Sequence, residues 1–189
     1  MASIITATNS NGLTHVADNS GVLQLASGTG NLVTVPSVTG TAMVSGNMPA
    51  FSAYATGTTS ISNSTWTKIT LGTEEFDTNS NFASSRFTPT VSGYYQINGD
   101  VYMAGGGALT QAGVSIYKNG TAYKTAAASG TLASLPFNAP QVCVSSVVYF
   151  NGSTDYVELY CFINDNAASP IYVGGIANTW FNGVLVRAA

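Results

Sequence analysis

Residues 87–103 read FTPTVSGYYQINGDVYM, and from Gly93 onward the side chains of this stretch alternate in character. A strand places successive side chains on opposite sides of its sheet, so the alternation sorts them into two faces. One face carries Tyr95, Ile97, Val101 and Met103. The other face carries Tyr94, Gln96, Asn98 and Tyr102. The stretch therefore predicts a long strand over residues 93–103.

Similar segments continue on both sides of this strand, from residue 49 to the C-terminus. Turn residues recur about every 8 to 12 positions, a spacing typical of a β-sandwich. Asn119-Gly120 predicts a tight hairpin, because Asn-Gly accepts the positive φ angles of a type I′ turn, and residues 151–154 predict another. No segment shows helical periodicity, so we expect an all-β domain. Its expected strands are Phe51–Thr56, Thr65–Ile69, Gly93–Met103, Ala112–Tyr117, Thr121–Ala127, Gln141–Phe150, Asp155–Ile163 and Thr179–Arg187.

Two of these strands are apolar on both faces, whereas a strand of an antiparallel sandwich normally has one wet face. In residues 141–150 one face carries Val142, Val144, Val148 and Phe150, and the other carries Cys143, Val147 and Tyr149. Residues 180–186, WFNGVLV, have the same character. Such strands need a second cover beyond the opposite sheet, and another copy of the chain supplies it most simply. The outward side chains expected at this contact are Tyr94, Gln96, Tyr102, Val147, Tyr149 and Trp180.

The composition supports an oligomer and excludes several classes of function. Only 7% of the 189 residues are charged, whereas soluble domains carry about 25%, so hydroxyl and amide groups must cover much of the surface. With five Lys and Arg and a net charge of −3, the chain lacks the basic clusters of an electrostatic nucleic-acid binder. No apolar run approaches the roughly 18 residues of a membrane span. The N-terminus lacks the basic region of a secretory signal peptide, which favours assembly in the cytoplasm.

Residues 1–48 differ from the remainder of the chain. They contain no aromatic residue, and Asp18 is their only charged side chain. Short alternating segments at 22–25 and 32–35, separated by the turn signal at 27–31, predict two strands that are marginal alone. We expect them to form an anchor and extended β stalk, ordered when identical copies associate, followed by a globular domain over residues 49–189. A disordered leader is the alternative.

The spacing of Phe87, Gly93, Tyr95 and Ile97 resembles the central motif of the C1q/TNF-like family, with Ile97 where an aromatic residue is usual. Residues 49–53 resemble the first strand of that family, and Phe181, Gly183 and Leu185 resemble its closing strand. Further matches to the family occur in the same order along the chain: Phe76-Asp77 and Phe82 resemble the segment before the motif, and residues 118–120 resemble a hairpin in the middle of the domain. The resemblance covers residues 49–189 and implies a trimeric jelly roll. A collagen stalk is missing, and the interval from Phe82 to Phe87 is shorter than usual.

Residues 17–35 resemble segments of bacteriophage tail fibres. Together the two resemblances imply a virion protein, assembled in the host cytoplasm, whose N-terminal segment binds other virion proteins. The trimeric knob would bind a host-surface receptor, since aromatic, amide and hydroxyl groups suit glycans. The loops at 105–111, 128–138 and 164–171 are the expected variable ends, and no receptor-binding residue is assigned. The alternatives are a head-fibre or capsid-decoration protein and, third, a polysaccharide depolymerase.

Residues suited to catalysis or metal binding are sparse. His15 is the only histidine and lies in the N-terminal segment, so a Ser-His-Asp arrangement is not expected; three copies of His15 on a trimer axis are a weak metal alternative. Glu74, Glu75 and Asp77 form the densest acidic group, expected on a solvated loop, with a cation site or catalysis as alternatives. We expect no enzyme activity, no resident metal and no cofactor.

Two further residue types are assigned structural roles. Cys143 and Cys161 flank the turn at 151–154 and could face each other across a hairpin, but two buried thiols are expected in a cytoplasmic assembly. Asn-x-Ser/Thr sequons occur at Asn63, Asn119 and Asn151. Glycosylation is not expected without a signal peptide.

Overall fold

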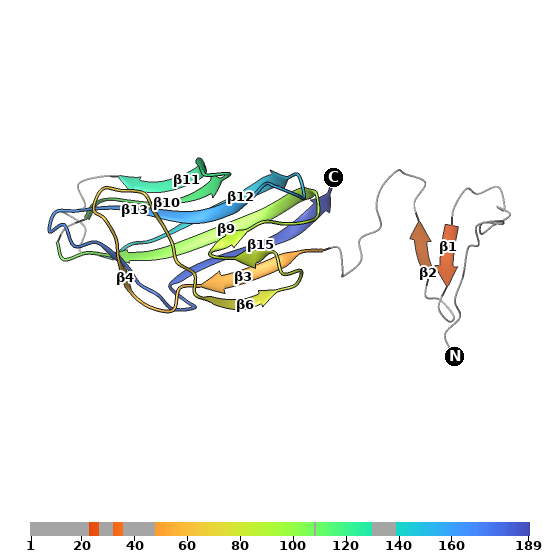
Figure 1. Ribbon diagram of the computed structural model, residues 1–189, viewed down its shortest axis with the longest axis horizontal. Coiled ribbons are helices and arrows are strands. Elements are labelled where there is room, and N and C mark those ends of the chain that lie inside the picture. Colours follow the sequence, from red (N-terminus) through yellow and green to blue (C-terminus); the bar gives the residue numbers. More distant parts are fainter. Residues whose placement is uncertain (1–22, 27–31, 36–47, 108, 130–138) are drawn as a thin grey trace. The chain divides into compact units, whose positions relative to one another are not determined.

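The computed structural model describes residues 23–26, 32–35 and 48–189, except 108 and 130–138. The chain divides into two compact units, Met1–Ala42 and Met43–Ala189, which are described separately. In the first unit, β1 (Leu23–Ala26) pairs antiparallel with β2 (Leu32–Val35), so that Leu23 lies opposite Val35. The two expected strands of the N-terminal segment are confirmed (Figure 1).

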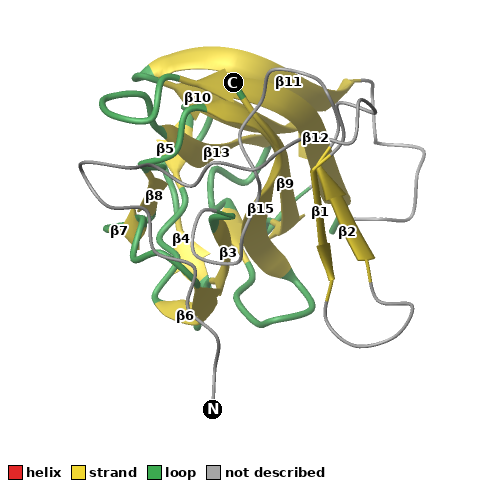
Figure 2. Cartoon of the chain, turned by 90° about the vertical axis from the view of Figure 1, so that its right-hand side faces the viewer, coloured by secondary structure: helices red, strands yellow, loops and turns green. Residues whose placement is uncertain are grey.

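The second unit is a sandwich of two antiparallel sheets. The seven-stranded sheet has the order β4 (Thr59–Ser60), β14 (Ile171–Tyr172), β9 (Gly93–Ala104), β15 (Thr179–Ala188), β3 (Ala50–Tyr54) and β6 (Thr73–Asp77), with β12 (Gln141–Phe150) also paired to β9. The six-stranded sheet has the order β11 (Thr121–Ser129), β10 (Leu109–Lys118), β13 (Val157–Asp165), β8 (Arg86–Phe87) and β7 (Phe82–Ala83), with β5 (Thr67–Lys68) also paired to β13. Among the described residues there are strands and loops but no helix, hence none that could cross a bilayer (Figure 2).

The core lies between the sheets and begins with β9. Its inward side chains Tyr95, Ile97, Val101 and Met103 are fully buried, whereas Tyr94 on the other face is 45% exposed. The predicted alternation is therefore confirmed. Burial raises the pKa of Tyr95 to about 12, and its hydroxyl donates to the Val91 carbonyl oxygen at 2.7 Å.

Aromatic rings from both sheets fill one part of this core. Phe51 stacks on Phe87 and Phe82, with ring centroids 4.2 and 5.0 Å apart, and meets Phe181 edge-on at 5.2 Å. Edge-to-face and stacked pairs of this kind add stability beyond the area that they bury. All seven residues of the motif that supports the resemblance lie in the interior: Phe87, Gly93, Tyr95, Ile97, Phe181, Gly183 and Leu185.

Gly183→Ala is expected to lower the free energy of unfolding by about 2 kcal/mol, because extra atoms in a filled core force neighbours to move. A Cβ atom at Gly183 would lie 2.6 Å from Cδ1 of Ile97 and 2.8 Å from Cε1 of Phe51. Gly57→Ala is the matched control, since its Cβ atom would meet nothing within 4 Å. Urea titration measures both variants, and equal losses would contradict the packing described here.

The turn at 118–120 is confirmed, but the predicted hairpin at 151–154 is wrong. Asn119 and Gly120 have φ angles of 52° and 80°, as a type I′ turn requires. The strands on either side of residues 151–154 do not pair: β12 pairs with β9 and β13 pairs with β10, so the connection crosses between sheets. A turn signal shows that the chain changes direction, but it does not identify the partner of the next strand.

The acidic stretch is a strand rather than a loop. Residues 73–77 form β6, which pairs with β3 and ends the path of the seven-stranded sheet. Its sequence, TEEFD, lacks a regular apolar face, and Glu74, Glu75 and Phe76 are exposed. Charged side chains are typical of edge strands, where they oppose unwanted pairing with other chains.

Candidate functional site

Four exposed apolar side chains occupy neighbouring positions of β9, β12 and β15 on the outer face of the seven-stranded sheet, and we call them the apolar patch: Tyr94, Val147, Tyr149 and Val184. Tyr149 on β12 lies opposite Tyr94 on β9. Gln96 on β9 lies between Val147 on β12 and Val184 on β15, and it is the register partner of both. The four are 42 to 52% exposed. The rings of Tyr94 and Tyr149 lie 5.4 Å apart between centroids. Exposed apolar side chains grouped on one sheet face are typical of an interaction surface.

A row of uncharged polar side chains, the amide row, crosses the same face beside the patch. Nε2 of Gln96 donates to Oγ of Ser145 at 2.8 Å and to Oδ1 of Asn98 at 2.9 Å. Oγ of Ser145 donates to the same Asn98 oxygen at 2.8 Å, and Nδ2 of Asn98 donates to Oδ1 of Asn182 at 2.9 Å. Because these bonds join β12, β9 and β15, they fix the side chains that border the patch.

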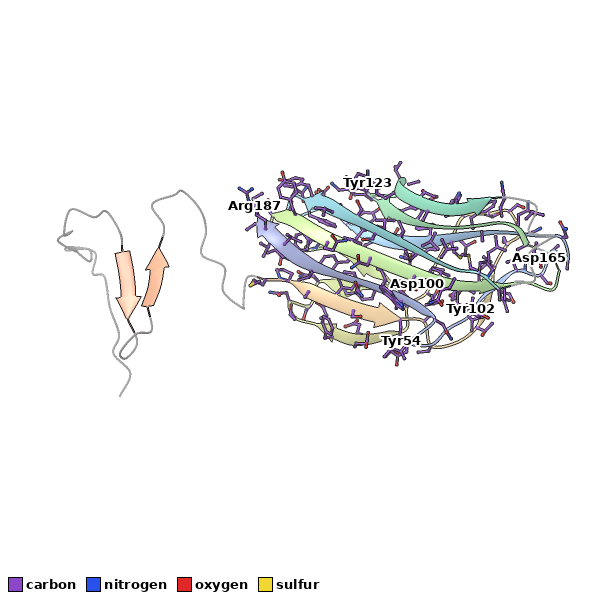
Figure 3. The ribbon with its side chains drawn as sticks, turned by 180° about the vertical axis from the view of Figure 1, so that it is seen from behind. Tyr54, Asp100, Tyr102, Tyr123, Asp165 and Arg187 are labelled. Carbon is purple, nitrogen blue, oxygen red and sulfur yellow. The ribbon has the colours of Figure 1, made fainter. Side chains whose placement is uncertain are left out.

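Asp100 lies farther along β9, beyond the amide row (Figure 3). Its Oδ2 accepts from Nε2 of Gln141 at 2.9 Å, while Oδ1 is buried without a hydrogen-bond partner among the described residues. Burial raises the pKa of Asp100, although hydrogen bonds from Gln141 and the Val101 backbone oppose the shift. The register places Trp180 opposite Asp100, and Tyr102 opposite Gln141.

The six predicted contact residues all lie on this face, but they fall into two groups. Tyr94, Gln96, Val147 and Tyr149 form or adjoin the apolar patch. Tyr102 and Trp180 lie near Asp100 and are half-buried. Val184 was missing from the predicted set, although the alternation of WFNGVLV places it on the same face as Trp180.

Two of the predicted variable loops are tied together by the Asp165 carboxylate, which is 1% exposed. It accepts the backbone N–H groups of Gly106, Gly107, Ala167 and Ser169 at 3.0 to 3.1 Å. Burial alone would raise the pKa of Asp165, but these hydrogen bonds outweigh it and hold that pKa below its ordinary value. Figure 3 places Asp165 at the end of the sandwich opposite Arg187. Most of the third loop, 128–138, lies outside the described residues.

A polar pocket of about 500 Å³ opens beside the six-stranded sheet, and we call it the cationic pocket. Its lining residues are Lys68, Ser80, Asn81, Ala83, Ser84, Arg86, Thr88 and Thr90. Behind the two cations lies Glu158, whose side chain is 4% exposed. Oε1 of Glu158 accepts from Nζ of Lys68 at 2.6 Å and from Nε and Nη2 of Arg86 at 2.9 Å. Sequence reasoning missed this site, because pairing of β13 with β5 and β8 unites residues distant in the chain.

The remaining predicted ligands and thiols are dispersed. Glu75 accepts from Oγ of Ser52 at 2.7 Å, and Asp77 accepts from the Phe82 N–H at 2.7 Å, so the acidic stretch serves separate partners. The described residues contain no group of three or more side chains suited to a metal ion. His15 lies outside the described residues.

The two cysteines are free and lie on different sheets, in β12 and β13. Cys161 is buried, which raises the pKa of its thiol to about 12. The expectation of two buried thiols is wrong for Cys143, which is exposed. The cause is its position in β12, where it shares the outward face with Val147 and Tyr149.

The asparagines of the three sequons all have structural hydrogen bonds. Asn63 exchanges two bonds with the backbone of Asp165. Asn119 donates to Oδ1 of Asp155 at 2.7 Å, and Oδ1 of Asn151 accepts from the backbone N–H groups of residues 153–155. Each amide therefore stabilises a turn or a loop.

Comparison with known proteins identifies the fold. No family model and no curated protein matches the chain by sequence. Among solved structures it is similar to the globular domain of zebrafish complement 1qA (17% identity, 75% of this chain and 99% of that one, TM-score 0.54). It is also similar to murine APRIL (11% identity, 74% and 99%, TM-score 0.54) and to the Eiger TNF of S. frugiperda (8% identity, 75% and 93%, TM-score 0.56). The chain has a C1q/TNF-like jelly-roll fold, as the resemblance predicted.

Proposed function

We propose that this chain is a homotrimeric binding module whose copies associate through the apolar patch. The observation that carries the proposal is the exposure of Tyr94, Val147, Tyr149 and Val184 on one sheet face. Burying these side chains would gain roughly 25 cal/mol for each square ångström removed from water. Only 7% of the residues are charged, so a single copy lacks the charged surface that usually keeps monomers soluble.

A second copy of the same chain is the occupant that fits this face best. The patch is bordered by the amide row, whose carboxamides and hydroxyls can donate and accept toward an identical surface. Arg187 is exposed opposite Tyr94 at the border of the patch, and the side chains of the patch and the amide row are themselves uncharged. The resemblance of residues 49–189 to trimeric jelly rolls supports three copies rather than two.

The module serves, in this proposal, as the knob of a bacteriophage virion fibre. Residues 1–48 attach it to the particle, and the sandwich binds a receptor on the host surface. The tail-fibre resemblance of residues 17–35 supports this assignment. Three weak sites on each trimer, and several trimers on each particle, give strong adhesion by avidity.

Removal of residues 1–48 is expected to leave a folded trimer that no longer enters particles. Sedimentation equilibrium of residues 49–189 measures the assembly, and immunogold labelling of particles carrying the full chain measures its location. Gold at the tail tip is the expected result. A soluble monomeric knob would contradict self-association, and gold on the capsid lattice would show a head-decoration protein instead. Release of reducing ends from host polysaccharide would show a depolymerase.

A further inference from the structure

The cationic pocket concentrates positive charge in a chain that has little. Two of the five Lys and Arg residues, Lys68 and Arg86, line it, and no acidic side chain does. Glu158 behind them supplies one negative charge against two positive charges, so the group keeps one net positive charge. The chain as a whole carries −3. The positive charge in the pocket therefore attracts a single anionic group.

Both cations are held in place before any ligand arrives. Nζ of Lys68 donates to Glu158 and to the Ser84 carbonyl oxygen at 2.9 Å, which leaves one of its three N–H groups. Arg86 donates through Nε and Nη2 to Glu158, and its guanidinium lies 3.7 Å above the Tyr156 ring centroid. Among the described residues nothing accepts from Nη1 of Arg86. Prepositioned donors bind an oxyanion with little loss of side-chain entropy.

The walls of the pocket are built from hydroxyl groups on a tightly held segment. Asn81 fixes it, because its Oδ1 accepts from the Thr90 N–H at 3.3 Å and its Nδ2 donates to the Asn79 carbonyl oxygen at 3.1 Å. Ser80 and Ser84 have φ angles of 53° and 51°, a conformation uncommon for residues other than glycine, asparagine and aspartate. Serine thus occupies two positions where glycine would adopt the backbone conformation at a lower free-energy cost.

Aromatic rings continue the site along the outer face of the six-stranded sheet. Tyr160 lies opposite Lys68 in the pairing of β13 with β5, and its ring stacks on Tyr117 with centroids 3.8 Å apart. Trp66 extends the group, 6.3 Å from Tyr117 between centroids. Sugar rings bind to aromatic faces while neighbouring polar groups fix their hydroxyls.

We propose that the cationic pocket binds a sugar carrying one oxyanion group, a carboxylate or a phosphate. Lys68 and Arg86 pair with the oxyanion, the serine and threonine hydroxyls meet the sugar hydroxyls, and Tyr160 and its neighbours contact adjoining rings. This inference rests on the proposed binding function and names the ligand class of its receptor. The pocket belongs to the sheet opposite the apolar patch, so a trimer formed through the patch presents three open pockets.

Calorimetric titration of the full chain with glucuronate, glucose 6-phosphate and glucose tests the proposal. We expect one or both acidic probes to bind and the neutral glucose to bind at least about 10-fold more weakly, since charge-assisted hydrogen bonds are roughly twice as strong as neutral ones. The tighter of the two acidic probes identifies the oxyanion. Equal binding of the neutral probe, or no binding of either acidic probe, would overturn the proposal.

Two variants locate the site. Arg86→Gln removes the guanidinium. Ala83→Trp fills the pocket from an exposed lining position opposite Arg86 and leaves Lys68, Arg86 and Glu158 themselves unchanged. Both are expected to weaken binding of the acidic probe about 10-fold or more, whereas Lys124→Gln, on β11 outside the lining, should bind as the unmodified chain does. Unchanged binding by Ala83→Trp would overturn the assignment to this pocket. Sedimentation of the same samples separates the two proposals: a trimer that binds no acidic sugar refutes only the ligand, and a monomer refutes the assembly.

Discussion

Val147→Asp is expected to convert the proposed trimer into folded monomers. Val147 is 52% exposed in the apolar patch, on the same face of β12 as Tyr149, so a second copy bound to the patch would enclose it. An aspartate there would place an unpaired carboxylate in each contact, and burying such a charge costs several kcal/mol. Sedimentation velocity at micromolar concentration measures the change in assembly.

The neighbouring side chains make this variant a clean probe. Val148, the next residue, is the one that packs in the core, so the fold itself is expected to survive, with near-normal thermal unfolding. Tyr123→Asp is the matched control, because Tyr123 is 45% exposed but lies on β11 of the opposite sheet. It is expected to remain trimeric. A trimeric Val147→Asp variant would refute the interface, and dissociation of both variants would show a general effect of charge.

Asp165→Asn is expected to lower the free energy of unfolding by about 3 kcal/mol at neutral pH. The carboxylate accepts four backbone N–H groups inside the protein. An asparagine offers one oxygen, and its amide N–H₂ would face donors that then lack an acceptor, at roughly 1 to 3 kcal/mol for each. Urea titration measures the loss, and Asp155→Asn, on the 151–155 turn, serves as a comparison.

The loss caused by Asp165→Asn is expected to depend on pH in a defined direction. The pKa of Asp165 is lowered in the folded state, against about 3.9 when unfolded. A lowered carboxylate pKa stabilises the fold above the unfolded value, and that stabilisation disappears as the pH falls through the folded value. The difference between the unmodified chain and the variant should be constant above about pH 5 and shrink below about pH 4. A difference that is as large at pH 2.5 as at pH 7 would contradict the role assigned to the carboxylate.

Local sequence pattern predicted those parts of the fold that depend on neighbours in the chain. The alternation of β9 and the Asn119-Gly120 turn are set by residues two or fewer positions apart, and both are confirmed. The strand β6 was missed because an edge strand needs no apolar face. The false hairpin at 151–154 arose because strand partners are chosen by the whole sandwich, not by the turn.

The same distinction between local pattern and long-range pairing applies to the candidate sites. The outward faces of β9 and β12 could be read from their alternation, which is why Tyr94 and Tyr149 were placed together. The cationic pocket could not, because Glu158 lies 90 residues from Lys68 and 72 from Arg86. Only the pairing of β13 with β5 and β8 brings them together, and no local signal encodes that pairing.

The amide row has a consequence for the conditions under which such an assembly persists. Interfaces that depend on ion pairs weaken as salt rises, because mobile ions screen exposed charges within about 10 Å at 0.1 M. Gln96, Asn98, Ser145 and Asn182 carry no net charge to screen. Contacts built from carboxamides and apolar side chains would hold as well in concentrated salt as in dilute fresh water. The proposed trimer could therefore pass between such environments without dissociating.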